Sequence, residues 1–365
     1  MNTMLIFILS LFVFQCGFPP NFRIFRLTTP IVIIYSEHGG TLELPVRGAT
    51  GWAAVAIPLR SEPSHNADVI SNLTPGQGFT IIKECGEWWK VRINNADGDV
   101  SGWVLHRGCF INLTDIVPSI VFDITNAYSS LKRSGGYKIP NITGYALYEA
   151  WAFNYRLGRY EFIVPILYST GRRIFEAQQA ALADGNTIII YEAFRPRATQ
   201  QSVVCNLRRL MERNSSVRRA INTLPWGLNW FISTGISNHQ RGAAIDAGLG
   251  RIISQETRVS GAYSSTHITS VERFIMPTPM HELSPQAATF TRPVSSSCPN
   301  AWRTATLACR MTEGALLLQR YLADAGFTPL ASEWWHFNCL EGVRIANEIG
   351  IRGEFFTSTL YSQVP

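Results

Sequence analysis

The 365-residue sequence has little charge. Asp, Glu, Lys and Arg make up 16% of it, whereas 46% of the residues are hydrophobic. This balance excludes an intrinsically disordered chain, which needs high charge and few hydrophobic residues. The sequence also lacks an internal repeat and a coiled-coil heptad, which argues against a repeat architecture. Its length is sufficient for one large core and a small accessory domain.

The N-terminal apolar stretch is too short to cross a bilayer. It covers residues 4–14, whereas a spanning helix needs about 20 apolar residues. Its length is typical of a signal-peptide core, although no Lys or Arg precedes it and no A-x-A cleavage site follows. We therefore expect residues 1–20 to be a signal peptide, with an uncleaved membrane anchor as the alternative. The mature protein is expected to be secreted or periplasmic.

Acidic residues are fewer than basic ones, with 26 Asp and Glu against 32 Lys and Arg, and the formal net charge is +6. A basic protein suits an anionic partner such as nucleic acid, a membrane surface or a cell wall. The clearest basic cluster is NLRRLMERNSSVRRA, residues 206–220, and no aromatic residue interrupts it. Binding of single-stranded nucleic acid normally adds aromatic stacking to such charge. We therefore expect a solvated helix face there and no nucleic-acid partner.

Cysteine is sparse, with seven in the chain. Removal of a signal peptide that contains Cys16 would leave six, an even number that fits disulfides in an oxidising compartment. The local pairs Cys85–Cys109 and Cys298–Cys309 are the expected ones. Buried free thiols are the alternative.

Residues 50–113 consist of short β-prone runs separated by turn residues, which predicts a small barrel. Three segments resemble the bacterial type of SH3 domain: R-S-x-P-S at 60–64, G-x-x-W-K-V at 86–91 and G-W-V at 102–104. The resemblance implies an SH3-like domain over residues 45–115 that binds a cell wall or positions a substrate. The alternative is a generic barrel in which Trp88, Trp89 and Trp103 form the core.

The remaining part, residues 120–352, mixes helix and strand patterns. Helical spacing of apolar residues covers 162–185 and 315–327, and both segments end near a glycine that suits a C-terminal cap. β-branched and aromatic runs predict strands over 186–194 and 331–338. No strict βαβ rhythm is present, so the predicted fold class is α+β.

Three side chains in this part form a candidate metal site. The stretch SNHQRGAAIDAG contributes His239 and Asp246, and the distant EWWH contributes His336. Two neutral imidazoles and one carboxylate are a frequent catalytic zinc set that leaves a fourth position for water. Small residues at Gly242 and Ala244 are expected to keep the substrate space open.

Two more residues suit hydrolysis beside such a metal. Glu333 lies three residues before His336 and is the expected general base. In a flat strand these two positions face opposite sides, so a twist, bulge or turn is required. Arg195 follows a predicted strand and could stabilise an oxyanion. A Ser237-His239-Asp246 triad is less favoured, because no nucleophile elbow is present.

The order of these motifs resembles the zinc D-alanyl-D-alanine dipeptidases of the vancomycin-resistance type. The matching segments are S-x-H-x-x-G-x-A-x-D, E-W-W-H, NITGYALYEAWAFNYRLG, YEAFRP and LLLQRYLADAGF, and the likeness covers roughly residues 120–345. The resemblance implies a domain with a small antiparallel sheet flanked by helices. It also implies zinc ligands at His239, Asp246 and His336, a base at Glu333, and transition-state stabilisation by Arg195.

The resemblance further implies substrate contacts from Ser237 and from Tyr137, although the spacing of Tyr137 is off by one residue. One segment departs from the family. The aspartate that grips the free amine of the dipeptide is replaced by His281, with Glu282 beside it. The resemblance as a whole implies hydrolysis of D-Ala-D-Ala as the expected activity. The alternatives are a D,D-carboxypeptidase acting on peptidoglycan stem peptides and an inactive wall-binding protein.

Overall fold

The computed structural model describes residues 42–94, 98–123, 129–143 and 151–357. The expected signal peptide, residues 1–20, lies outside them. None of the helices in the described part combines the length and apolar character needed to span a bilayer.

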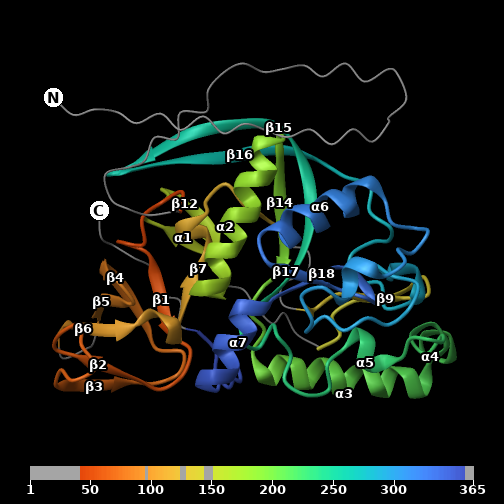
Figure 1. Ribbon diagram of the computed structural model, residues 1–365, viewed down its shortest axis with the longest axis horizontal. Helices are drawn as coiled ribbons and strands as arrows, with labels where there is room; N and C mark the ends of the chain where they lie inside the picture. Colours follow the sequence, from red (N-terminus) through yellow and green to blue (C-terminus); the bar gives the residue numbers. More distant parts are fainter. Residues whose placement is uncertain (1–41, 95–97, 124–128, 144–150, 358–365) are drawn as a thin grey trace. The chain divides into compact units, whose positions relative to one another are not determined.

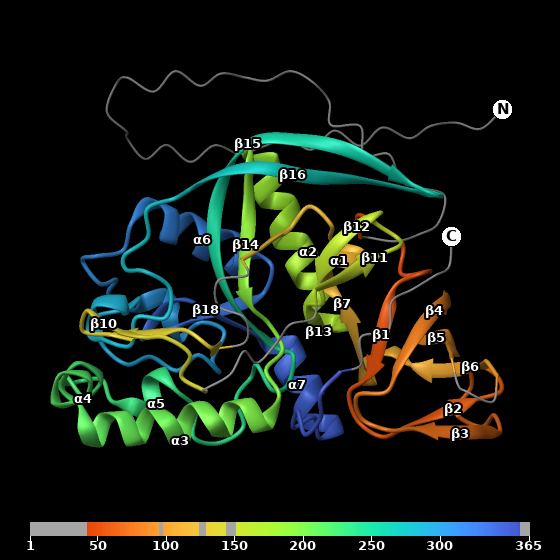
Figure 2. The same cartoon turned by 180° about the vertical axis from the view of Figure 1, so that it is seen from behind.

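An eight-stranded antiparallel sheet contains the short strands predicted from the sequence for residues 50–113 (Figure 2). Its spatial order is β13-β7-β1-β4-β5-β6-β2-β3. The first seven strands along the chain are β1 Thr50–Ala53, β2 Ile57–Arg60, β3 Val69–Leu73, β4 Gly78–Cys85, β5 Trp88–Ile93, β6 Val100–Leu105 and β7 Cys109–Asn112. Trp88 and Trp89 are buried as expected, whereas Trp103 is half-buried.

The eighth strand comes from beyond the predicted SH3-like domain. β13, Pro165–Leu167, pairs with β7, and the short helix α1, Leu113–Ile116, lies between β7 and the rest of the chain. The predicted helix over 162–185 therefore begins too early. Residues 165–167 form the strand, and α2 covers only Tyr168–Ala183. Gly185, with a φ of +74°, follows the helix as the sequence indicates.

A second sheet carries the candidate site. Its order is β17-β18-β15-β14-β8. The sixth strand, β16, pairs with the later part of β15, on the edge opposite β14 (Figure 1). The strands are β8 Val121–Phe122, β14 Asn186–Glu192, β15 Ala244–Ser260, β16 Tyr263–Arg273, β17 Phe327–Leu330 and β18 Glu333–Cys339. The β8–β14 pair is parallel, so the expectation of a purely antiparallel sheet is wrong at that edge. Helices α2 and α6, Glu313–Asp324, pack on this sheet, and α7, Leu340–Ile349, follows β18 directly.

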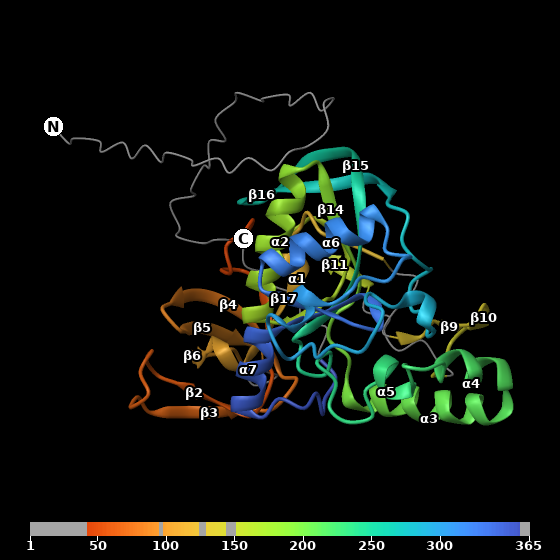
Figure 3. The ribbon, with the colours of Figure 1, turned by 45° about the vertical axis from the view of Figure 1, so that its right-hand side comes forward.

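The other helices surround a separate apolar core below this sheet in the view of Figure 3. They are α3 Arg197–Arg213, α4 Ser215–Ile221 and α5 Leu228–Phe231. Val203 and Leu207 on α3 and Val217 on α4 are fully buried in that core. Two small hairpins complete the described part: β9 Lys132–Ser134 with β10 Tyr137–Ile139, and β11 Trp151–Asn154 with β12 Arg159–Phe162.

The described cysteines are all free thiols. Cys109 is buried in the barrel, whereas Cys85 ends β4 on the surface. Cys298 and Cys309 are both exposed. The expected pairs Cys85–Cys109 and Cys298–Cys309 are therefore wrong in this structure, and the alternative of free thiols holds, although only two of the six are buried.

Candidate metal centre

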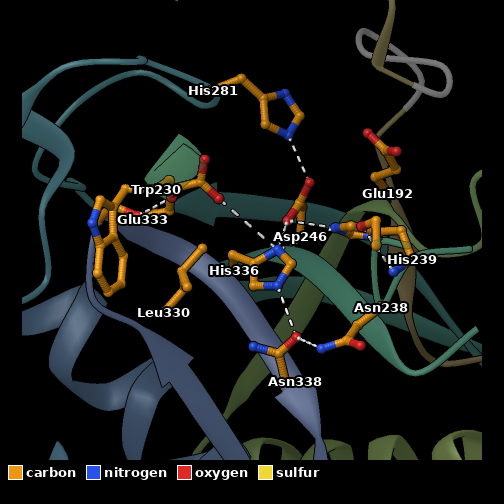
Figure 4. A network of polar contacts seen from close by, with 12 residues as sticks. Glu192, Trp230, Asn238, His239, Asp246, His281, Leu330, Glu333, His336 and Asn338 are labelled. Atoms are coloured by element: carbon orange, nitrogen blue, oxygen red, sulfur yellow. Dashed lines mark hydrogen bonds and ion pairs between the residues drawn. The ribbon is translucent and has the colours of Figure 1, made fainter. Parts of the chain in front are cut away.

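Strand pairing brings together residues that are distant in the sequence. Asp246 on β15 is the direct register partner of His336 on β18. His239 lies in the loop that leads into β15. Asp246 Oδ1 is 3.2 Å from His239 Nε2 and 3.0 Å from His336 Nδ1, and the two imidazole nitrogens are 3.1 Å apart. Figure 4 shows both rings turned toward the carboxylate.

Hydrogen bonds on the outer side of each ring fix which nitrogen faces the cluster. His239 Nδ1–H donates to the carbonyl of Ala193 at 2.7 Å. His336 Nε2–H donates to Oδ1 of Asn338 at 3.0 Å, and the same oxygen accepts from Asn238 Nδ2 at 2.7 Å. In the neutral form of each ring, the inward nitrogen therefore presents a lone pair, the arrangement that outer partners impose on metal-binding histidines. Burial opposes protonation of His336, but the contact with Asp246 raises its pKa, so without a metal this ring can also hold a proton against the carboxylate.

These donors fit zinc. Two imidazole nitrogens and a carboxylate oxygen converge in a buried place, which is unfavourable unless a metal ion or a proton lies between them. Zinc bonds of about 2.0 Å at tetrahedral angles place neighbouring ligand atoms about 3.3 Å apart. The three separations here, 3.0 to 3.2 Å, are close to that spacing. His239, Asp246 and His336 can therefore hold one zinc ion with little rearrangement.

The second oxygen of Asp246 faces a third histidine. His281 Nε2 is 3.0 Å from Asp246 Oδ2, and His281 has a positive φ of 58°. Burial lowers the pKa of His281 to about 4. Burial also opposes ionisation of Asp246, but its interactions with His239, and then with His281 and His336, hold its pKa well below its usual range. Asp246 is therefore a carboxylate under all ordinary conditions.

A second group of metal-type ligands shares Asp246: Glu192 and His281 lie with it within 4.8 Å. The negative charge of Glu192, however, is already balanced by a neighbouring cation. It forms a close ion pair with Arg195 Nε and accepts the hydroxyl of Ser129 at 2.5 Å. Although burial opposes its ionisation, the charge of Arg195 keeps the pKa of Glu192 at about 2. The group around His239 and His336 is therefore the better metal site.

Glu333 lies in the same pocket as the metal ligands. The register of β17 and β18 breaks between Pro329, which pairs with Phe337, and Leu330, which pairs with Glu333. This irregularity turns Glu333 to the side of His336, which a flat strand would not do. Its Oε2 is 3.9 Å from His336 Nδ1. Burial raises the pKa of Glu333 to about 8, a value suited to proton transfer near neutral pH.

Arg195 follows β14 and is fully enclosed. Glu192 occupies its Nε, and Gln200 Oε1 accepts from its Nη1 at 2.5 Å. Nη2 lies 3.8 Å from Asp246 Oδ2, so this end of the guanidinium faces the cluster. The two outer partners hold the group in one orientation, as an oxyanion-stabilising donor needs.

The other predicted substrate residues divide into two groups. Ser237 and His281 line the metal pocket, and Ser237 Oγ also accepts from the backbone N–H of His239 at 3.3 Å. Tyr137 lies on β10, where its side chain is 45% exposed and outside the pocket lining. Glu282 is buried but turned away, because its carboxylate accepts from the backbone N–H of Gly135 at 2.6 Å.

The small residues of the opening stretch have a different role from the one expected. Gly242 and Ala244 do not line the metal pocket in the described part. Gly242 has a φ of +61°, and a Cβ there would lie 2.6 Å from Phe110 and 2.8 Å from the backbone nitrogen of Leu167. Gly242 is thus required by the close approach of β7 and β13, not by the substrate.

Sequence reasoning did not identify three residues that shape the site. Lys132 on β9 is buried and lines the metal pocket, a hollow of about 160 Å³. Asn338 orients His336, and Gln200 orients Arg195. Asn338 follows EWWH by two positions, so it could have been found as the next residue on the same strand face. Lys132 and Gln200 carry no local signal.

Comparison with known proteins identifies one part of the chain. A family model described as a bacterial SH3 domain matches residues 52–108, within the predicted 45–115 and outside the metal centre. No curated protein matches the chain. The chain therefore carries a bacterial SH3 domain at residues 52–108, in front of a mixed α+β part.

Proposed function

We propose that the protein is a zinc-dependent peptidase that hydrolyses the D-Ala-D-Ala peptide bond. One observation carries the proposal: His239, Asp246, His336 and Glu333 lie in one pocket, with the three ligand atoms at the spacing of a zinc site. The substrate class comes from the resemblance of the ordered motifs to D-alanyl-D-alanine dipeptidases.

In this proposal, zinc held by His239, Asp246 and His336 supplies the Lewis acid for the reaction. Glu333 accepts the proton of the attacking water and returns it to the departing amine. Arg195 donates from Nη2 to the oxygen that becomes negative in the tetrahedral state. Gln200 and Glu192 keep the guanidinium in place for that role.

The pocket lining favours an N-acylated peptide over the free dipeptide. A free dipeptide carries an ammonium that needs an acidic partner. Asp246 and Glu333 are the acids that line the pocket in the described part, and both have other roles. The carboxylate of Glu282 accepts from the backbone of Gly135, and Lys132 adds an amine to the lining, not an acid. A D,D-carboxypeptidase acting on peptidoglycan stem peptides is therefore the favoured form of the activity.

The SH3 domain supports the same setting. Because the resemblance of residues 45–115 implies wall binding, we propose that this domain holds the enzyme near peptidoglycan. A secreted or periplasmic location is part of the proposal and rests on the N-terminal stretch alone. An inactive wall-binding protein is the competing function, and the intact set of ligands and base argues against it.

The test uses the full chain without its signal segment. Bound metal is measured by elemental analysis, and released D-Ala is measured with free D-Ala-D-Ala and with a stem pentapeptide, each with and without a chelator. The proposal expects about one zinc per chain and chelator-sensitive release, faster from the pentapeptide. Zinc-loaded protein that releases D-Ala from neither substrate would refute it and leave the wall-binding function.

A further inference from the structure

A second hollow lies beside the metal pocket along α3. Its volume is about 550 Å³, against about 160 Å³ for the metal pocket. The two hollows share Ser233 and Ile236 in their linings, so they are neighbours across one short loop. A substrate longer than two residues could therefore extend from the metal pocket into this hollow, which we call the α3 groove.

The α3 groove is strongly basic. Four arginines line it, and Glu212 is its one acid. These arginines are Arg197, Arg208, Arg209 and Arg352. Arg197 forms an ion pair with Glu354, whereas Arg208, Arg209 and Arg352 make no ion pair with the part of the chain that the structure describes.

This arrangement changes the interpretation of the basic cluster 206–220, which the sequence analysis assigned to a solvated helix face. Arg208 and Arg209 line the α3 groove, whereas Arg218 and Arg219 on α4 do not. Three guanidiniums that have no ion pair within the described residues surround one hollow, and together they create a field that attracts an anion. Each also offers the paired N–H donors that match the two oxygens of a carboxylate or phosphate.

Two glutamines join the α3 groove to the candidate site. Gln200 lines the groove, donates to the carbonyl of Ser233 at 2.6 Å and accepts from Arg195. Gln240 also lines it, accepts from the backbone N–H of Ser237 at 2.8 Å and donates to the carbonyl of Arg352 at 3.0 Å. A ligand in the groove would thus contact Gln200 and Gln240, the two residues that hydrogen-bond to Arg195 and Ser237.

We propose that the α3 groove is a second subsite, which binds a negatively charged oxyanion group of the substrate several bonds away from the cleaved peptide bond. The inference rests on the proposed peptidase function and adds a requirement to it: good substrates are anionic as well as long. The oxyanion is a carboxylate of the peptide or a phosphate attached to it, and the two sources share the same arginine chemistry.

The test compares two pentapeptides that end in D-Ala-D-Ala and differ at one position, where one carries a carboxylate and the other its amide. The unaltered full chain should show a KM about five- to tenfold lower for the acidic peptide, the gain expected from two or three solvent-exposed charge pairs. Higher ionic strength should reduce this preference because salt screens exposed charges. A third pentapeptide, with a phosphate ester at the same position, distinguishes the phosphate source from the carboxylate source, because the preferred oxyanion gives the lower KM.

The variants decide whether the preference comes from the groove. The double variant Arg208→Gln/Arg209→Gln should lose the preference and keep its kcat for the neutral peptide. The double variant Arg218→Gln/Arg219→Gln removes the same charge from the neighbouring helix α4 and should keep the preference. Equal KM values for both peptides in the unaltered protein, or equal losses in the two double variants, would overturn the proposal.

Failure of the peptidase function itself would look different, because neither peptide would release D-Ala. In that case binding of the labelled acidic peptide, measured by fluorescence anisotropy in the same variants, tests the α3 groove independently. Weaker binding to Arg208→Gln/Arg209→Gln than to Arg218→Gln/Arg219→Gln supports the subsite, and equal binding rejects it.

Discussion

Asn338 provides the most informative test of the proposed metal centre, because it contacts the proposed ligand His336 and is not itself a proposed ligand. Its Oδ1 accepts from His336 Nε2 at 3.0 Å and from Asn238 at 2.7 Å, and its side chain is buried. The substitution Asn338→Ala removes the acceptor and leaves the Nε2–H of His336 without it. The ring can then rotate, or shift its proton to the nitrogen that faces the cluster.

The expected cost follows from that contact. A buried donor left unsatisfied costs about 1–3 kcal/mol, and loss of an outer partner of a metal-bound histidine weakens metal binding by about 10- to 100-fold. The two ranges agree, since a tenfold change corresponds to about 1.4 kcal/mol. We therefore expect Asn338→Ala to bind zinc about 10- to 100-fold more weakly.

The assay is zinc competition against a fluorescent chelator, with circular dichroism to confirm folding. The matched control is Asn186→Ala, because Asn186 is also buried but bonds to Tyr321 away from the site at 3.0 Å. Asn186→Ala should reduce thermal stability and leave zinc affinity unchanged. A folded Asn338→Ala protein with unaltered zinc affinity would show that His336 is not a ligand oriented in this way.

Four further predictions follow from the site and its support. Glu333→Gln should keep its zinc and lose about 10²- to 10⁴-fold in kcat; turnover near that of the unaltered enzyme would remove Glu333 from proton transfer. His336→Ala should lose the zinc whereas His281→Ala keeps it, and the reverse result in elemental analysis would move the metal to the cluster with Glu192. Gly242→Ala should lower the free energy of unfolding by about 2–4 kcal/mol, from positive-φ strain and overlap with neighbouring atoms; chemical denaturation with an unchanged midpoint would contradict this. The structure has four exposed thiols, Cys85, Cys205, Cys298 and Cys309. Native alkylation followed by mass spectrometry should label these four, and an unlabelled Cys298–Cys309 pair would restore the disulfide expected from the sequence.

Residues with a strong local pattern could be found from the sequence. His239 and Asp246 fall in one short stretch, and His336 lies in an aromatic run that predicts a strand. All three could therefore be predicted from the sequence as candidate metal ligands. The structure adds that Asp246 and His336 are register partners on adjacent strands. That they bind zinc stays a prediction, which the variants above test.

Features that depend on long-range pairing could not be predicted. The residues 165–167 read as the start of a helix, because the apolar spacing continues through them, but pairing with β7 makes them a strand. Lys132 reaches the metal pocket only because the hairpin β9–β10 folds against it. Gly242 was expected to keep the substrate space open. Its contact with Phe110 on β7 could not be predicted, because the two residues are far apart in the sequence.

The strand β13 has a consequence for how the protein unfolds. It completes the edge of the sheet that contains the SH3 domain and leads directly into α2, which packs against β14 of the other sheet. In addition, Leu167 N–H donates to the carbonyl of Gly242, in the loop that carries His239. Separate domains joined by a linker melt independently, whereas a shared strand makes their unfolding one cooperative event. The SH3 domain and the loop that carries His239 are therefore expected to lose their structure together, so a substitution in one should also lower the stability of the other.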